Sequence, residues 1–180
     1  MSSADLRIRC REIGSADVDR IADLLTRGFP ERTREFWLRA LRRLSEHSAP
    51  EGFPQYGYML ESDGSPVGVI LLICSCLDTG GEKRIRCNVS SWYVEPGYRV
   101  YASILASHAL KREQATYFNI TPRPWTLRIL EAQGYKRYCS GRFVGIPALA
   151  VGLWGDILLH DSHRIRAPVR ICHHLRLTRS

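Results

Sequence analysis

The first third of the chain changes from an alternating pattern to a helical one. Between residues 6 and 11, apolar residues alternate with arginines, and this period of two predicts a half-exposed strand. From Val18 the apolar positions recur at three- and four-residue spacing and stop at Gly28, which predicts a helix. The same spacing returns from Thr33 to about His47, so a second helix is expected there.

The middle of the chain has the pattern of a hairpin followed by another long strand. Tyr56 to Glu61 is a strand pattern, and the segment from Ser62 to Pro66 is rich in turn-forming residues. Val67 to Leu77 is almost continuously apolar, as expected for a central strand. Arg84 to Val94 predicts the next strand.

Beyond Val94 the pattern alternates between helix and strand. Helices are expected at 101–112 and 124–133, and strands at 115–120 and 135–144. The whole order is therefore β-α-α-β-β-β-α-β-α-β, an α/β (α+β) architecture for residues 1–145. Residues 146–180 are interpreted as an extension that is first apolar and then basic, with its start packed on the same domain.

The join between the strand ending at Val94 and the next helix is a candidate anion site. A helix that begins just after a strand leaves its first backbone N–H groups unpaired, with the positive end of the helix dipole behind them. Arg99 adds a charged donor, and the small Ala102 and Ser103 allow close approach of a phosphate. The alternative is an ordinary strand-to-helix connection with a solvated arginine.

Composition places the chain among globular proteins of one domain. It has 180 residues, of which 44% are hydrophobic and 24% are charged, so disorder is not expected. The net charge of +8 makes acidic ligands reasonable partners. No run approaches the roughly 20 apolar residues of a membrane-spanning helix, and the start of the chain lacks an apolar core, which predicts a cytoplasmic protein.

The cysteines fall mostly inside apolar or strand-like runs, which predicts reduced, buried thiols. They are residues 10, 74, 76, 87, 139 and 172. Cys74 and Cys76 share one face of a strand, but no second cysteine pair or histidine accompanies them. No metal site is therefore predicted.

The element order, together with VEPGYRVYASIL and EAQGYKRY, resembles the GCN5-related N-acetyltransferase (GNAT) superfamily. The resemblance covers residues 6–145. It implies a mixed, mostly antiparallel sheet flanked by helices, and acetyl-CoA or another acyl-CoA as cosubstrate. It also implies that the acyl group is moved to an amine, for which a small-molecule acceptor is expected. The alternative is a non-catalytic acyl-CoA-binding or regulatory module, with or without association to a membrane surface.

The resemblance also maps a cofactor site onto this chain. The family motif runs from a Val-x-Pro element into Arg/Gln-x-x-Gly-x-Gly/Ala, and here Val94, Pro96 and Arg99 match it. Ala102 and Ile104 take its two small positions, although isoleucine is not usual in the second one. In the family, the strand edge here pairs with the pantetheine arm. The implied cofactor-binding residues are Trp92, Tyr93, Val94, Arg99, Val100, Tyr101, Ala102, Ser103 and Asn119.

Catalytic residues are not assigned by the sequence. Where family enzymes often carry a tyrosine acid, this chain has Leu130. Glu95 is interpreted as a solvated loop carboxylate, and Ser90 and Ser91 are not basic. The substitutes considered for the acid are each explained equally well by strand packing; they are Tyr117, Tyr135, Tyr138 and Cys139.

The segment from 146 to 180 has two parts with different expectations. Its apolar first part, up to residue 159, is too short to span a bilayer and is expected to complete the core, or to dock on a membrane surface or partner. From His163 onward it carries five arginines and no acidic residue. That part is either a solvated terminus or a contact surface. The contact would be with the anionic head groups of a membrane surface or with an acyl carrier protein. The lack of aromatic residues after Trp154 argues against nucleic acid.

Overall fold

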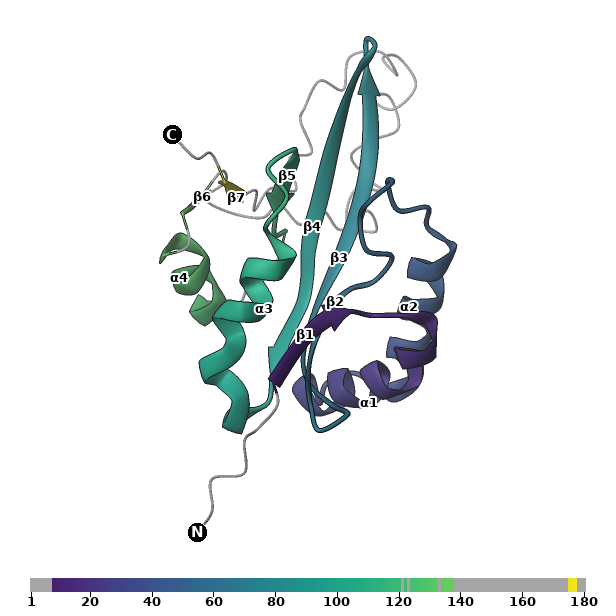
Figure 1. The fold of residues 1–180 in the computed structure, drawn as a ribbon, viewed down its shortest axis with the longest axis vertical. Helices are drawn as coiled ribbons and strands as arrows, with labels where there is room; N and C mark the ends of the chain where they lie inside the picture. The colour runs from purple at the N-terminus through teal and green to yellow at the C-terminus, as the bar shows by residue number, and fades with distance from the viewer. Residues whose placement is uncertain (1–7, 121, 123, 133, 138–174, 178–180) are drawn as a thin grey trace, which may run out of the picture. The chain divides into compact units, whose positions relative to one another are not determined.

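The protein is described here by a computed structural model (Figure 1). The structure describes residues 8–120, 122, 124–132, 134–137 and 175–177. The chain divides into two compact units, Met1–Asn119 and Ile120–Ser180, and each is considered by itself. The boundary expected near residue 145 stays a prediction.

A five-stranded sheet forms the centre of the first unit, with its strands in the order β1-β2-β3-β4-β5. Neighbouring strands are antiparallel except β4 and β5, which are parallel. This is the mixed, mostly antiparallel sheet that was predicted. The strands are β1 Ile8–Glu12, β2 Gly57–Ser62, β3 Ser65–Thr79, β4 Glu82–Val94 and β5 Ala115–Phe118.

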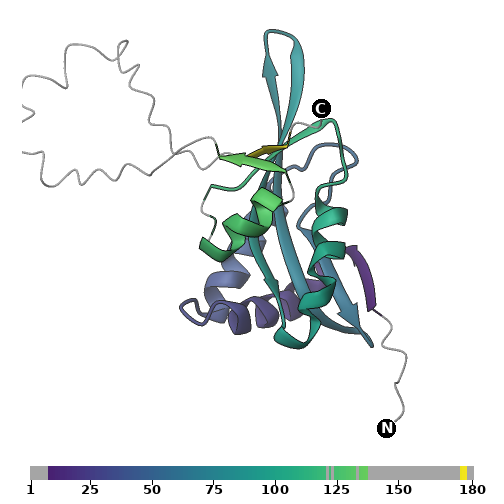
Figure 2. The ribbon, with the colours of Figure 1, turned by 90° about the vertical axis from the view of Figure 1, so that its left-hand side faces the viewer.

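Helices cover both faces of this sheet. The helical segments of the first unit are η1 Ser15–Asp17, α1 Val18–Gly28, α2 Arg34–Glu46, η2 Pro96–Tyr101 and α3 Ala102–Ala109, where η marks a 3-10 helix. Figures 1 and 2 show α1 and α2 on one face of the sheet and α3 on the other. Among the described helices, none is both long and apolar enough to cross a bilayer.

The second unit contains one helix and a small strand pair. These elements are α4 Pro124–Ala132, β6 Tyr135–Arg137 and β7 Leu175–Leu177, and β6 pairs antiparallel with β7. Together with the first unit they confirm the predicted element order through residue 137. The rest of the strand expected up to residue 144, and most of the extension after 145, lie outside the described residues.

The α1–α2 face of the sheet holds the core that the helical patterns predicted. Thr33 begins α2 as an N-cap, since its hydroxyl accepts the N–H of Phe36 at 3.2 Å. The buried core residues on this face come from α1, α2, β2, β3 and the loops around them. They are Ile13, Ile21, Ala22, Leu24, Leu25, Trp37, Leu41, Leu44, Tyr56, Met59, Val69 and Leu71.

The β2–β3 turn is tighter than the predicted segment from Ser62 to Pro66. Only Asp63 and Gly64 lie between the strands, and both have positive φ, at 47° and 78°. Two consecutive left-handed residues are the requirement of a two-residue hairpin turn whose twist matches the strands. Asp and Gly tolerate this conformation, so the turn is fixed locally.

Arg11 on β1 clamps the start of α1 to the sheet. Its guanidinium donates to both carboxylate oxygens of Asp17, at 2.7 and 2.8 Å, and its Nε donates to Glu61 on β2 at 2.8 Å. Asp17 also accepts the N–H of Gly14 at 3.0 Å and is only 6% exposed. The Arg11 hydrogen bonds hold the pKa of Asp17 below its ordinary value of 3.8.

The cysteines depart from the sequence prediction. Cys74 and Cys87 are opposite each other in the β3–β4 register and form a disulfide. The prediction of a reduced thiol is therefore wrong for both, because strand pairing brings Cα atoms that are 13 residues apart to 4.0 Å. Cys76 is a free but exposed thiol. Cys10 is a half-buried free thiol, and burial raises its pKa to about 11.

Replacing Asp17 with asparagine tests the clamp. Asp17→Asn removes one of the two carboxylate charges that Arg11 faces, and we expect the free energy of unfolding at pH 7 to fall by about 1–3 kcal/mol. Because the folded-state pKa of Asp17 is lowered, its contribution is present above about pH 4 and is lost as the pH falls through that pKa. Urea unfolding between pH 7 and pH 2 should show the two proteins converging in acid. A difference that stays constant with pH would contradict the assignment.

Candidate functional site

The pairing between β4 and β5 ends halfway along β4. Their parallel pairing runs from Ile85 opposite Ala115 to Asn88 opposite Phe118, where β5 ends. The strand β4 continues to Val94, still paired with β3 on its other side. Among the described residues, no strand pairs with the far edge of β4 after Asn88.

Backbone polar groups of β4 point toward this open edge. The N–H of Glu95 donates to the carbonyl of Val67 at 2.9 Å, so the backbone of Glu95 points toward β3. Since successive residues of a strand point their N–H and C=O groups to opposite sides, those of Trp92 and Val94 point away from β3. The edge predicted to bind the cofactor therefore presents donors and acceptors that have no strand partner within the described part of the chain.

A β-bulge lies beside this edge. Tyr93 is opposite Val69, but Ser90 is opposite Leu71, so β4 has one residue more than β3 in this interval. Ser91 has a φ of 45°, in the left-handed region that a serine seldom adopts. The bulge reverses the alternation of side chains beyond it and turns Tyr93 toward the α1–α2 face.

Tyr93 is fixed by the end of α1. Its ring lies on Gly28, where an added Cβ would come within 2.4 Å of the ring. The ring of Phe29 is 6.3 Å away between centroids. The side chain of Tyr93 therefore packs against the α1–α2 layer, so a contribution of this residue to the open edge would come from its backbone.

The join after β4 is helical throughout, which differs from the expected row of unpaired N–H groups. The N–H of Tyr98 donates to Glu95 at 2.9 Å, and that of Ala102 donates to Arg99. These i→i+3 bonds of η2 lead directly into α3, so the N–H of Ala102 is already used. The part of the predicted anion site that depended on this N–H is not available in the described conformation.

The side chains of the join remain open to solvent. Arg99 and Ser103 are exposed and lie four residues apart, a spacing that puts both on one side of a helical segment. Val100 and Ile104 form a second exposed pair at the same spacing and are 78% and 42% exposed. The join thus offers a guanidinium and a hydroxyl beside an apolar strip.

Glu95 links the join to α1. Its carboxylate accepts from Nε and Nη2 of Arg27 at 2.9 and 2.8 Å. Glu95 is thus a surface carboxylate in an exposed ion pair, and the arginine partner from the last turn of α1 was not predicted. Arg27, Gly28 and Phe29 together bind the end of α1 to both ends of the segment from Tyr93 to Glu95.

The candidate acids from the sequence lie in packed positions. Tyr117 is 2% exposed, its hydroxyl accepts the N–H of Arg112 at 3.3 Å, and burial raises its pKa. Leu130 is fully buried, Tyr135 is 3% exposed, and Asn119 is 8% exposed. Tyr138 and Cys139 lie outside the described residues. For Tyr117 the structure favours the packing role over proton transfer.

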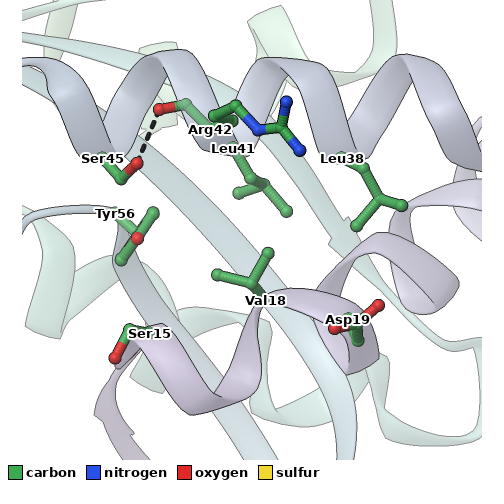
Figure 3. A pocket seen from close by; sticks show the side chains of 8 residues that line it. All are labelled: Ser15, Val18, Asp19, Leu38, Leu41, Arg42, Ser45 and Tyr56. Atoms are coloured by element: carbon green, nitrogen blue, oxygen red, sulfur yellow. Dashed lines mark hydrogen bonds between the residues drawn. The ribbon is translucent and has the colours of Figure 1, made fainter.

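A separate hollow lies between α1 and α2 (Figure 3). Its volume is about 430 Å³, and none of the predicted cofactor residues lines it. Figure 3 shows Val18 and Leu41 from the two helices on either side of it, with Asp19 and Arg42 also on its wall. Among the described residues, no group of histidine, cysteine or acidic side chains could hold a metal ion.

Comparison with solved structures decides the fold. A GCN5-related N-acetyltransferase from Kribbella flavida is 17% identical with a TM-score of 0.53, and the match covers 76% of this chain and 35% of that protein. The aminoglycoside N-acetyltransferase AAC(6')-Iy in complex with CoA is 12% identical with a TM-score of 0.58, covering 81% and 99%. The chain has the GNAT fold.

A third structural neighbour is Arabidopsis thaliana Naa50 in complex with the bisubstrate analogue CoA-Ac-MVNAL. It is 15% identical with a TM-score of 0.55. The match covers 77% of this chain and 91% of that protein. No protein-family model matches the chain, and no curated protein matches its sequence. At these identities the shared property is the GNAT fold, and this chain spans only about a third of the Kribbella flavida protein.

Substitutions at Ser91 test the bulge. A β-branched residue tolerates positive φ poorly, so Ser91→Val should lower the free energy of unfolding by about 1–2 kcal/mol. Ser91→Gly relieves the same conformation and should leave stability unchanged or slightly raised. Denaturant unfolding of both variants gives the comparison. Equal stability of the two variants would show that residue 91 does not have positive φ.

Proposed function

We propose that this protein is an acyltransferase that moves an acyl group from acetyl-CoA or another acyl-CoA to an amine. The observation that carries the proposal is the end of β4–β5 pairing at Asn88, which leaves the backbone groups of Trp92 and Val94 open. The GNAT fold supports it, since neighbours with this fold include CoA complexes of N-acetyltransferases.

The open edge suits the pantetheine arm of CoA. That arm carries two amides, and amides pair with the unsatisfied N–H and C=O groups of a strand edge as an added strand would. The arm would run along Val94 and Trp92, so its thioester end would lie at the bulge around Ser91. Asn119 follows directly after β5, on the other side of the opening.

The diphosphate of CoA would lie at the join. Because η2 uses the N–H of Ala102, we assign the larger share of this contact to the exposed side chains of Arg99 and Ser103. The start of α3 adds the positive end of its dipole. Val100, Tyr101 and Ala102 complete the segment that the diphosphate would approach.

The chemistry requires one bond to form and one to break. The amine nitrogen attacks the thioester carbonyl carbon, the C–N bond forms, and the C–S bond breaks. The amine loses one proton to water, and the CoA thiolate takes one from water. Backbone N–H groups near the bulge would stabilise the negative charge that develops on the carbonyl oxygen, so the reaction does not require a side-chain acid.

The acceptor and the further partners predicted from the sequence are compatible with this proposal. A small-molecule amine remains the expected acceptor. Contact with a peripheral membrane surface or an acyl carrier protein would use residues 146–180, nearly all of which lie outside the described residues. A cytoplasmic location is likewise proposed.

Calorimetric titration with acetyl-CoA and longer acyl-CoAs tests the cofactor site. Arg99→Ala should weaken binding by about tenfold, the effect of losing roughly 1.4 kcal/mol from a charged hydrogen bond. Ala102→Glu should weaken it further, since it sets a carboxylate against the diphosphate. Arg39→Ala is the control, because Arg39 is an exposed arginine on α2 outside the site. The control should bind as the wild type does.

The outcomes separate the proposed function from its alternatives. Failure of every acyl-CoA to bind would contradict both the acyltransferase and the acyl-CoA-binding module. If acyl-CoA binds, release of free CoA thiol in the presence of a panel of amines supports the enzyme. Binding with no thiol release above the uncatalysed rate would instead support the non-catalytic module.

A further inference from the structure

A polar row on β4 leads away from the proposed thioester position. Leu71 belongs to the core on the α1–α2 face, and Ser90 lies opposite it, so Ser90 is on that face too. Alternation along the strand then puts Asn88 and Arg86 on the same face. Arg86 and Asn88 carry no signal in the sequence, because their common face follows only from the strand register.

Asn88 has an unsatisfied acceptor. Its Oδ1 atom is buried and has no hydrogen-bond partner among the described residues. A buried carbonyl oxygen without a partner is unfavourable, so its presence in a structure calls for an explanation. A ligand that donates a hydrogen bond would supply the missing partner.

The position of Asn88 indicates which ligand that is. It is the last residue of β4 that pairs with β5, so it marks the closed end of the opening. Acyl-CoA lying along Val94 and Trp92 would direct its acyl end toward this point. The nucleophile must meet the thioester carbon there. An attacking amine has N–H groups, and one of them could donate the hydrogen bond that Asn88 Oδ1 does not receive within the described residues.

Arg86 adds a charge to the same row. Two residues of a strand span about 7 Å, a distance that an arginine side chain can bridge. Arg86 is exposed and makes none of the ion pairs found among the described residues, whereas Arg84 is paired with Glu82 at 2.7 Å. A guanidinium next to the amine position that is unpaired within the described part of the chain suits a carboxylate on the acceptor.

We infer that the acceptor is a primary amine that also carries a carboxylate, with Asn88 Oδ1 accepting from the amine and Arg86 binding the carboxylate. This inference rests on the proposed function and deepens it by naming an acceptor class. The Asn88 hydrogen bond orients the nitrogen lone pair toward the thioester carbon. Arg86 binds the carboxylate of the acceptor and takes no part in the bonds that form and break.

Glycine and glycinamide are matched probes. Both carry a primary amine, but glycinamide has a neutral amide where glycine has a carboxylate. Thiol release from acetyl-CoA would be measured with the full chain and each amine, for the wild type, Arg86→Gln and Asn88→Ala. Arg86→Gln should lower kcat/KM about tenfold for glycine and less than twofold for glycinamide. Asn88→Ala should lower both by a similar factor of about ten, and Asn88→Asp, which keeps an acceptor oxygen, should restore glycinamide turnover.

Arg84→Gln is the matched control, because Arg84 lies on the same face but is paired and two residues further from the site. Arg84→Gln should leave kcat/KM unchanged for both glycine and glycinamide. All variants should bind acetyl-CoA within twofold of the wild type by calorimetry. Equal effects of Arg86→Gln on the two probes would overturn the carboxylate assignment. Unchanged turnover in Asn88→Ala would overturn the role of Asn88.

Two wild-type results distinguish this inference from the proposed function. A protein that binds acetyl-CoA but acetylates neither probe contradicts the acceptor class and leaves the cofactor site standing. A protein that binds no acyl-CoA contradicts the proposed function itself. Thermal unfolding midpoints close to the wild type would show that the variants are folded.

Discussion

The register between β3 and β4 is the constraint on which the candidate site depends. The extra residue that β4 carries between Ser90 and Tyr93 changes which side chains face which layer. Before it, Asn88 and Ser90 share the α1–α2 face. After it, Tyr93 takes that face and meets Gly28. A one-residue slip in a strand moves the side chains beyond it to the other face, so the bulge puts Tyr93 on the same face as Asn88 and Ser90.

The pairing pattern around the sheet supports that register. The disulfide between Cys74 and Cys87 joins two opposite positions of β3 and β4, and Arg11 holds the other edge of the sheet to the start of α1. The α1–α2 layer then buries its apolar stripes on β2 and β3. The open part of β4 is thus held by its pairing with β3, and the disulfide links the same two strands further along.

Much of the fold could be predicted from periodicity because its signals are local. The bounds of α1 match the predicted helix, and Thr33 and the Asp63–Gly64 turn are decided by neighbouring residues. Non-local features were not predictable in this way. The disulfide and the Arg27–Glu95 pair join residues far apart in sequence, and Ser91 lies in a continuous β-rich run without a glycine to mark the bulge.

The candidate site was predicted in outline and missed in detail for the same reason. The motif around Arg99 is contiguous in sequence, so the resemblance could locate it. The conformation of that segment depends on how η2 forms, and Asn88 and Arg86 gain their meaning only from the register with β3. Side chains that act together from alternate strand positions leave no spacing signal different from that of an ordinary strand.

The bond between Arg27 and Glu95 has a thermodynamic consequence. It links the last turn of α1, just before the α1–α2 connection, to Glu95, the residue that precedes η2. A ligand that displaces Glu95 must also displace Arg27 or break this ion pair, and a surface pair of this kind contributes about 0–1 kcal/mol. Coupling of this kind is reciprocal: whatever occupancy of the join does to the α1–α2 connection, occupancy of that connection does equally to the join.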